Sequence, residues 1–308
     1  MRKLLPLLGI WLLAAAACAG TAAVSPTPPA TPTPPRSPAT SPVASPRYPF
    51  PNDGSKLILR IATGGGFVAP AYLLTEVPEF ALYGDGRIIV PGPAATIFPA
   101  PLLPNLLVMR VTPAEIQKIL AAADGAGLLG PDASYDAVGI ADAGTTVFTT
   151  VVDGKVHRIS AYALSAGGDV GGRPGGSPSV GAARAKLAQF WTQMSDPGTF
   201  LGRAVGDTEA YVPAGLRVFL SDAGPADPTQ PAGQVVAWPL STDPATTGQP
   251  TTVQGTVCVA LTGNDLSSFL SVASTANTGT VWTYRNARYG VGVRPLYPNE
   301  TGCAGGSL

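Results

Sequence analysis

Charged residues are scarce in this sequence. They make up 12% of its 308 residues, and basic and acidic groups balance at 19 each. Soluble proteins usually carry about twice this share of charged residues. A near-neutral chain lacks the basic surface that attracts nucleic acids and anionic lipids, so we expect no nucleic-acid partner and no electrostatic hold on a membrane.

Histidine is nearly absent, and so are the common catalytic motifs. The single histidine, His157, excludes a zinc site built from several histidines. A Ser-His-Asp triad would have to use His157 without the Gly-x-Ser-x-Gly elbow, which the sequence also lacks. Its expected place on a strand beside a tight turn favours a structural role. We therefore expect no cofactor, and we favour a non-enzymatic role over an enzymatic one.

Long hydrophobic runs are missing except at the start of the chain. Residues 1–17 combine two basic residues with an apolar stretch, which is typical of a signal peptide. The 14 residues of the apolar stretch would form a helix about 21 Å long, which is shorter than the bilayer core of about 30 Å. A signal peptide is therefore favoured over a permanent transmembrane helix.

The sequence that follows, Ala15-Ala16-Ala17-Cys18, resembles the bacterial lipobox. The resemblance implies lipidation of Cys18, a palmitate-type anchor and a location on the outer face of the cell membrane. Simple secretion by ordinary signal peptidase, which also accepts Ala-x-Ala spacing, remains the alternative.

Proline is abundant beyond the leader, with 11 prolines between Ser25 and Pro51. This segment has too few large apolar residues to bury a core, and its prolines favour the extended polyproline II conformation. We expect residues 18–51 to be a lipid-anchored, disordered stalk, whose proline-rich part from Ser25 to Pro51 spans up to about 80 Å. A ligand for proline-binding domains is the alternative.

The remainder of the chain predicts an α+β fold, with antiparallel sheets and two or three packed helices. Leu57–Ile61 reads as a first strand, and Glu79–Val90 as a hairpin around Gly84-Asp85-Gly86. Thr112-Pro113-Ala114-Glu115 is a helix start with a capping box. A second helix is expected from Val180 to Met194, before Pro197.

Asp153-Gly154 is the strongest turn signal in the chain, because this dipeptide favours a two-residue type I′ hairpin. Such a turn fixes the register of the flanking strands. Residues that face each other must then have numbers that sum to 307, which pairs Phe148 with Ile159 and Thr150 with His157.

An internal echo suggests a duplicated strand-helix-hairpin unit. Val111–Ile116 and Leu261–Leu266 share one chemical pattern at an offset of 150 residues, and each is followed by a Thr-Val-aromatic-Thr strand. We therefore divide the body into a first α+β unit at 52–200 and a second at 201–308. A chance similarity of two capped helices is the alternative.

Two cysteines, Cys258 and Cys303, lie in the last quarter of the chain. An even number of cysteines in an exported body predicts a disulfide, which closes the second unit. On the chain-entropy model it stabilises the fold by about 3–4 kcal/mol.

Two sets of acidic residues are candidates for chemistry. A glycine-containing loop holds four aspartates that are weak candidates for a calcium cage, although their spacing matches no EF-hand: Asp124, Asp132, Asp136 and Asp142. Glu76 and Glu79 are the candidate carboxylate pair of a glycosidase, whose two groups must lie about 5 to 9.5 Å apart.

Six aromatic residues are candidates for either a groove or the core: Tyr48, Tyr72, Tyr83, Trp238, Trp282 and Tyr284.

The stretch from Pro78 to Pro93, with Arg294-Pro295-Leu296 near the end of the chain, resembles an uncharacterised family of exported lipoproteins from high-GC bacteria. The resemblance carries no activity. The favoured hypothesis is a membrane-tethered, extracytoplasmic binding module whose partner is an extracytoplasmic protein or a cell-wall component. The alternatives are a cell-wall-acting carboxylate hydrolase and a tandem α+β protein inhibitor.

Overall fold

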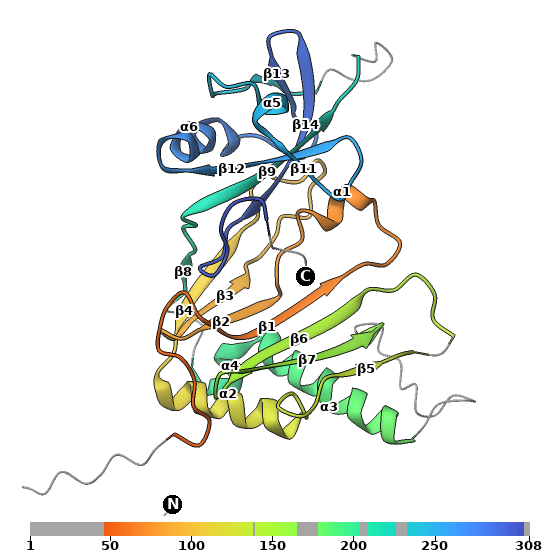
Figure 1. The fold of residues 1–308 in the computed structure, drawn as a ribbon, viewed down its shortest axis with the longest axis vertical. Coiled ribbons are helices and arrows are strands. Elements are labelled where there is room, and N and C mark those ends of the chain that lie inside the picture. Colours follow the sequence, from red (N-terminus) through yellow and green to blue (C-terminus); the bar gives the residue numbers. More distant parts are fainter. Residues whose placement is uncertain (1–45, 138, 165–177, 204–207, 226–232, 305–308) are drawn as a thin grey trace, which may run out of the picture. The chain divides into compact units, whose positions relative to one another are not determined.

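A computed structural model describes residues 46–137, 139–164, 178–203, 208–225 and 233–304. They belong to one compact unit that begins at Ser45. They form two mixed, mainly antiparallel sheets with helices packed against them, which confirms the predicted α+β class (Figure 1). The leader, Cys18 and most of the predicted stalk lie outside the described residues.

The first sheet has eight strands in the order β5-β7-β6-β1-β2-β3-β4-β8. All neighbours are antiparallel except β5 and β7, which run parallel. The bounds of the strands are β1 Leu57–Gly64, β2 Phe80–Tyr83, β3 Arg87–Pro91, β4 Leu106–Arg110, β5 Ala133–Tyr135, β6 Thr145–Val152, β7 Lys155–Tyr162 and β8 Glu209–Ala210.

Both predicted hairpins of this sheet are confirmed. Gly86, with φ of 84°, supplies the left-handed residue between β2 and β3. Asp153 and Gly154 have φ of 51° and 70°, as a type I′ turn requires. The register that follows pairs Phe148 with Ile159, as the sum of 307 predicts.

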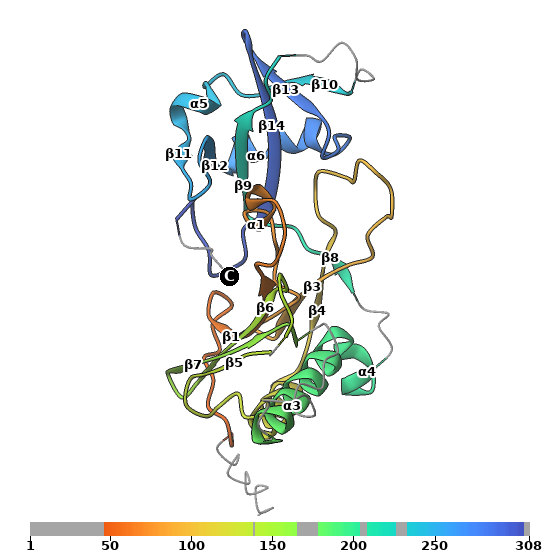
Figure 2. The ribbon, with the colours of Figure 1, turned by 90° about the vertical axis from the view of Figure 1, so that its right-hand side faces the viewer.

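Two helices, α2 (Pro113–Gly125) and α3 (Pro178–Ser195), cover one face of the first sheet (Figures 1 and 2). The capping box at the start of α2 is confirmed: Thr112 Oγ1 accepts from the Glu115 amide at 3.3 Å, and Glu115 Oε2 accepts from the Thr112 amide at 2.6 Å. A short helix, α4 (Pro197–Leu201), follows α3, so Pro197 both separates the two and starts the second.

The end of the predicted stalk packs on the body instead of belonging to the stalk. Tyr48 is buried in the core under α2, where its backbone exchanges hydrogen bonds with Gln117 at 3.0 and 2.7 Å. The Pro49 carbonyl accepts from the Asp153 amide at 2.8 Å. Between the prolines, Tyr48 and Phe50 carry apolar surface that the core can bury, and this overrides the proline-rich composition.

The second sheet has six strands in the order β10-β13-β14-β9-β12-β11. Only β10 and β13, among its neighbouring strands, run parallel. The bounds of the strands are β9 Gly215–Asp222, β10 Val235–Ala237, β11 Gln249–Pro250, β12 Thr256–Thr262, β13 Val281–Tyr284 and β14 Ala287–Pro295. The helices beside it are α1 (Pro70–Leu73), α5 (Pro244–Thr247) and α6 (Gly263–Ala273).

Helix α6 covers one face of this sheet, and an aromatic cluster fills the space between them. The Phe269 ring of α6 stacks on Trp282 of β13 with centroids 5.1 Å apart, and Trp238 lies 5.6 Å from Phe269. Burial of three aromatic side chains gives this half of the body its own core.

The internal echo holds in chain order but not in sheet order. Each copy is a strand, a helix and a hairpin: β4, α2 and β6–β7 in the first, and β12, α6 and β13–β14 in the second. In the first sheet, the first strand of the hairpin, β6, lies on the inner side of the hairpin and pairs with β1. In the second sheet, the second strand of the hairpin, β14, lies on the inner side and pairs with β9. The two copies therefore place equivalent hairpin strands in opposite order.

The chain passes from the first sheet to the second between β8 and β9, beyond the predicted boundary at residues 200 and 201. Strand β8, which follows that boundary, still pairs with β4 of the first sheet. Earlier in the chain, the Ala100 carbonyl of the first half accepts a hydrogen bond from the Thr278 amide of the second half at 2.8 Å. Each half therefore contributes backbone to the other.

The two helix starts of the echo allow a matched test of capping. Thr112 caps α2 with its side chain, whereas Thr262 occupies the same place on α6 without a side-chain hydrogen bond. We expect Thr112→Ala to lower the free energy of unfolding by about 1 kcal/mol and Thr262→Ala to change it by less than half as much. Urea denaturation of both variants measures the difference; equal losses would contradict this account of the cap.

Candidate functional site

A cavity of about 650 Å³ lies between the first sheet and the second. This volume is within the usual range of small-molecule sites. The first half contributes the end of β1, the segment after α1 and two residues of β6, and the second half contributes β9, the loop around β11 and the disulfide: Gly64, Gly65, Leu73, Leu74, Glu76, Thr145, Val147, Arg217, Phe219, Gln249, Pro250, Thr251, Thr252, Cys258, Cys303 and Ala304.

Glu76 is the acidic residue in the cavity wall. Its Oε2 atom is buried and has no hydrogen-bond partner among the described residues. Burial, and next the charge of Glu79, raise the pKa of the Glu76 carboxyl. A buried carboxylate oxygen without a partner is costly, so this position is prepared for a group that donates a hydrogen bond.

The backbone beside the cavity is held by a buried ionic cluster. Arg294 of β14 donates from Nε to the Glu76 carbonyl at 2.8 Å and from both terminal nitrogens to the two Glu300 oxygens, each at 2.8 Å. Arg217 Nη1 lies 3.8 Å from Glu300 Oε2. The side chains of Arg217, Arg294 and Glu300 are only 3%, 2% and 5% exposed.

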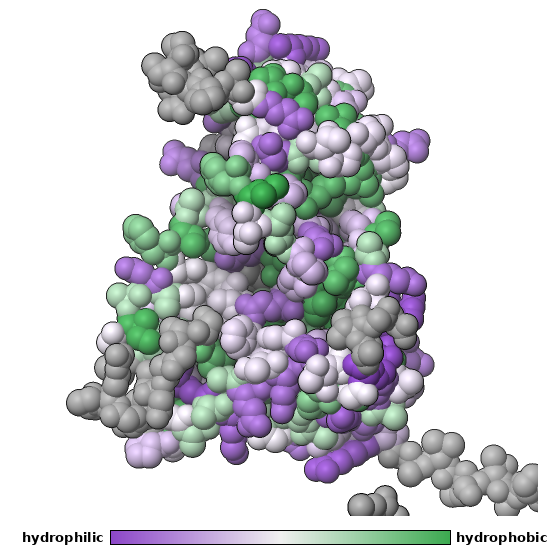
Figure 3. Space-filling model, turned by 180° about the vertical axis from the view of Figure 1, so that it is seen from behind, coloured by the Kyte–Doolittle hydropathy of each residue, from purple (hydrophilic) through white to green (hydrophobic). Residues whose placement is uncertain are grey.

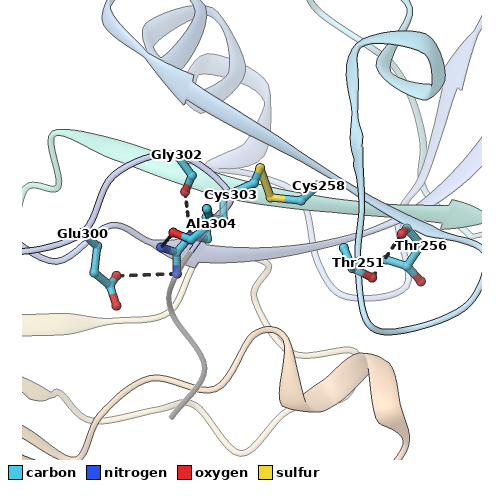
Figure 4. The surroundings of a disulfide bond; sticks show 8 residues. Thr251, Thr256, Cys258, Glu300, Gly302, Cys303 and Ala304 are labelled. Atoms are coloured by element: carbon cyan, nitrogen blue, oxygen red, sulfur yellow. Dashed lines mark hydrogen bonds and ion pairs between the residues drawn. A yellow bond between two sulfur atoms is a disulfide. The ribbon is translucent and has the colours of Figure 1, made fainter.

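The predicted disulfide between Cys258 and Cys303 is confirmed, with the two Cα atoms 5.9 Å apart. It fastens the last described residues to β12 (Figure 4). Arg217 donates to the Gly302 carbonyl at 2.8 Å and to the Ala304 carbonyl at 3.3 Å. The disulfide therefore holds both a wall of the cavity and the backbone acceptors of a buried cation.

Three tyrosines border the ionic cluster. Tyr83 donates to Asn299 Oδ1 at 2.7 Å and Tyr211 donates to the Leu296 carbonyl at 2.8 Å. Burial raises the pKa of Tyr211 to about 12 and that of Tyr83 and Tyr297 further, so all three phenols stay neutral at ordinary pH. Apolar packing of these rings shields the cluster from water, which strengthens its electrostatics.

The structure does not bring the four loop aspartates together. Asp124 accepts from the Tyr48 hydroxyl at 2.9 Å, and Asp132 accepts from the Arg158 amide at 2.8 Å. Asp136 lies near Arg184, and Asp142 turns the backbone with φ of 57°. Within the described ranges no group of three or more metal-ligating side chains is found.

The two candidate glutamates have different surroundings. Glu79 accepts a hydrogen bond from the indole Nε1 of Trp191 on α3 and is not part of the cavity wall. Glu76 lines the cavity. The pair thus offers one carboxylate to a bound molecule rather than two across a cleft.

His157 and most of the candidate aromatic residues are structural. His157 Nδ1 lies 2.8 Å from the Gly130 carbonyl oxygen. The rings of Tyr48, Tyr83, Trp238 and Trp282 are buried and Tyr284 is half-buried. Tyr72, 58% exposed, borders a second hollow of about 470 Å³ with Leu102 and Gly292.

Exposed apolar side chains do not mark one docking face. The most exposed are Phe98 at 96% and Phe67 at 88%. On the face seen in Figure 3, hydrophobic residues form several separate groups with hydrophilic residues between them. Among the described residues, no helix is both long and apolar enough to cross a membrane.

Sequence reasoning missed the buried ionic cluster, although one signal was present. Arg217 interrupts the apolar run of β9, and Arg294 interrupts that of β14. Charged residues inside buried strands are rare unless they are paired. The partner, Glu300, lies six residues beyond Arg294 in a loop, where sequence alone gives no reason to single it out.

We expect Glu300→Ala to lower the free energy of unfolding by about 3–5 kcal/mol, because it leaves two arginines buried without their carboxylate. Arg47→Ala is the control, since Arg47 and Asp124 form an exposed ion pair at 3.8 Å, and its cost should stay below about 1 kcal/mol. Chemical denaturation under oxidising conditions measures both. Similar small losses would show that the cluster contributes little.

Comparison with protein-family models, with curated proteins and with solved structures finds no match to this chain.

Proposed function

We propose that this protein is a non-enzymatic binding module on the outer face of the cell membrane, tethered by a lipid on Cys18. Its binding site is the cavity between the two sheets. The observation that carries the proposal is Glu76, which lines a ligand-sized cavity and whose buried Oε2 atom has no partner among the described residues.

The cavity suits a small molecule that presents N–H or O–H groups. Glu76 supplies a charged acceptor, whereas Thr145, Thr252 and Gln249 supply side chains that both donate and accept. Phe219 and Leu73 add apolar surface to the same wall. A sugar or peptide fragment of the cell wall has this combination of donors, acceptors and apolar faces.

A carboxylate hydrolase is the second candidate, because a raised pKa is what a general acid requires. It would need a second carboxylate facing the cavity, and Glu79 is instead bonded to Trp191. Binding is therefore the better supported of the two functions.

For the anchor, we expect the wild-type chain to be recovered with membranes and to carry acyl chains on the mature N-terminal Cys18. Cys18→Ala should remove the acyl mass and move the protein to the medium or to the soluble fraction. Fractionation and mass spectrometry of the mature N-terminus measure this. A wild-type N-terminus without acyl chains would refute the anchor and leave the cavity proposal standing.

For the cavity, we expect soluble peptidoglycan fragments, both glycan and peptide, to raise the Tm of the protein without being cleaved. Glu76→Gln should weaken the binding about tenfold, because it removes a charged acceptor. Glu209→Gln, an exposed change on β8, is the matched control and should leave the affinity unchanged. Equal affinity of Glu76→Gln and wild type would contradict the proposed site, and release of cleavage products would favour the hydrolase.

A further inference from the structure

The first sheet has a polar region on the face that α2 and α3 do not cover. Side chains alternate between the two faces along each strand. Phe148 of β6 and Ile159 of β7 belong to the core beneath the helices. Their neighbours Thr149 and Arg158 therefore lie on the opposite face, as does Arg60 of β1.

These three residues form one row across three strands. Arg60 pairs with Thr149 between β1 and β6, and Thr149 pairs with Arg158 between β6 and β7. Two strand spacings place the backbones of Arg60 and Arg158 about 10 Å apart. Burial lowers the pKa of Arg60, the charge of Glu300 opposes this shift, and the charges of Arg294 and Arg158 add to it.

Neither guanidinium group is hydrogen-bonded or ion-paired to an acid within the described part of the chain. No hydrogen bond or ion pair joins the guanidinium group of Arg60 or Arg158 to another described residue. Two acids lie nearby. The Glu300 oxygens accept from Arg294 and from the Tyr297 amide, at 2.8 to 3.1 Å, and Asp132 accepts from the Arg158 amide at 2.8 Å. Neither acid bonds to the guanidinium group of Arg60 or Arg158, so both groups keep their donors for another anion.

Thr149 gives a second, independent indication. It is 8% exposed, and its Oγ1 atom is buried without a hydrogen-bond partner in the described structure. On this face its neighbours across the strands carry the long arginine side chains of Arg60 and Arg158. An acceptor bound at this row would satisfy the Thr149 hydroxyl together with donors of the two neighbouring arginines.

We propose that Arg60, Thr149 and Arg158 form a binding site for an oxyanion, the carboxylate or phosphate group of a ligand. The two planar guanidinium groups match the paired oxygens of such an anion, and the Thr149 hydroxyl donates to it from the sheet. On β6, Thr145 and Val147 line the cavity, and Thr149 is the next residue of the same face. The site stands on its own residues and does not require the cavity ligand proposed above.

The test uses the full chain and sodium phosphate as the probe, titrated at constant ionic strength with sodium chloride as the balancing salt. Calorimetry or the rise in Tm should show saturable phosphate binding. Arg60→Gln and Arg158→Gln should each weaken it at least about tenfold, and Thr149→Val about fivefold. Without phosphate, Thr149→Val should keep or raise the wild-type Tm, because its hydroxyl has no partner to lose.

Lys155→Gln is the matched control, since it removes one positive charge from the opposite face of the same strand, β7, and should change phosphate affinity less than twofold. A parallel titration with sodium acetate distinguishes the sources: the same residue dependence indicates a carboxylate ligand, and binding of phosphate alone indicates a phosphoryl group. Stabilisation by chloride equal to that by phosphate would overturn the site. Wild-type affinity in Arg158→Gln would overturn it too. Because Arg158 is exposed, misfolding is an inadequate explanation for a loss of affinity in this variant.

Discussion

The arrangement of this protein depends on a carboxylate buried between arginines. Glu300 accepts two hydrogen bonds from Arg294 and lies 3.8 Å from Arg217. Arg294 also binds the Glu76 carbonyl of the first half of the chain. Breaking such a buried group is far more costly than breaking a surface pair, because the remaining charges keep their desolvation penalty. The cluster therefore fixes where the C-terminal loop, β9, β14 and the segment after α1 meet.

The contacts at this meeting point shape both the cavity and the surroundings of Arg217. The disulfide holds the C-terminal loop on β12, and the loop carbonyls complete the surroundings of Arg217. The space left between the sheets is the cavity that contains Glu76. Since the Glu300 oxygens bond to Arg294 and lie beside Arg217, Glu300 acts on Arg60 through its charge and makes no hydrogen bond to it. One buried cluster thus explains why the guanidinium group of Arg60 keeps its donors.

The local structure could be predicted from the sequence because its signals are local. Asp153-Gly154 determines both a turn and the register of eight residue pairs, and Thr112 with Glu115 determines a helix start. The disulfide followed from the number and position of the cysteines. The parallel edge strands β5 and β10 were missed, because three-residue strands carry little periodicity and their pairing depends on tertiary contacts.

The candidate site was predicted only in part. Glu76 was singled out, but its expected partner Glu79 is bonded to Trp191, more than a hundred positions away, which no local pattern shows. The row of Arg60, Thr149 and Arg158 joins strands that are separated by about ninety positions, and it becomes visible only once the β1–β6 register is known. The strand order of the echo also depends on long-range pairing, so the sequence repeat could indicate elements but not their placement.

The central claim is that the buried cluster makes the two sheets one cooperative unit, and native-state hydrogen exchange tests it most directly. The slowest amides of β1 and β2 in the first sheet should be compared with those of β9 and β14 in the second, over a series of low denaturant concentrations. The account predicts that both sets converge on one free energy of opening. Two separate free energies, one for each sheet, would contradict it.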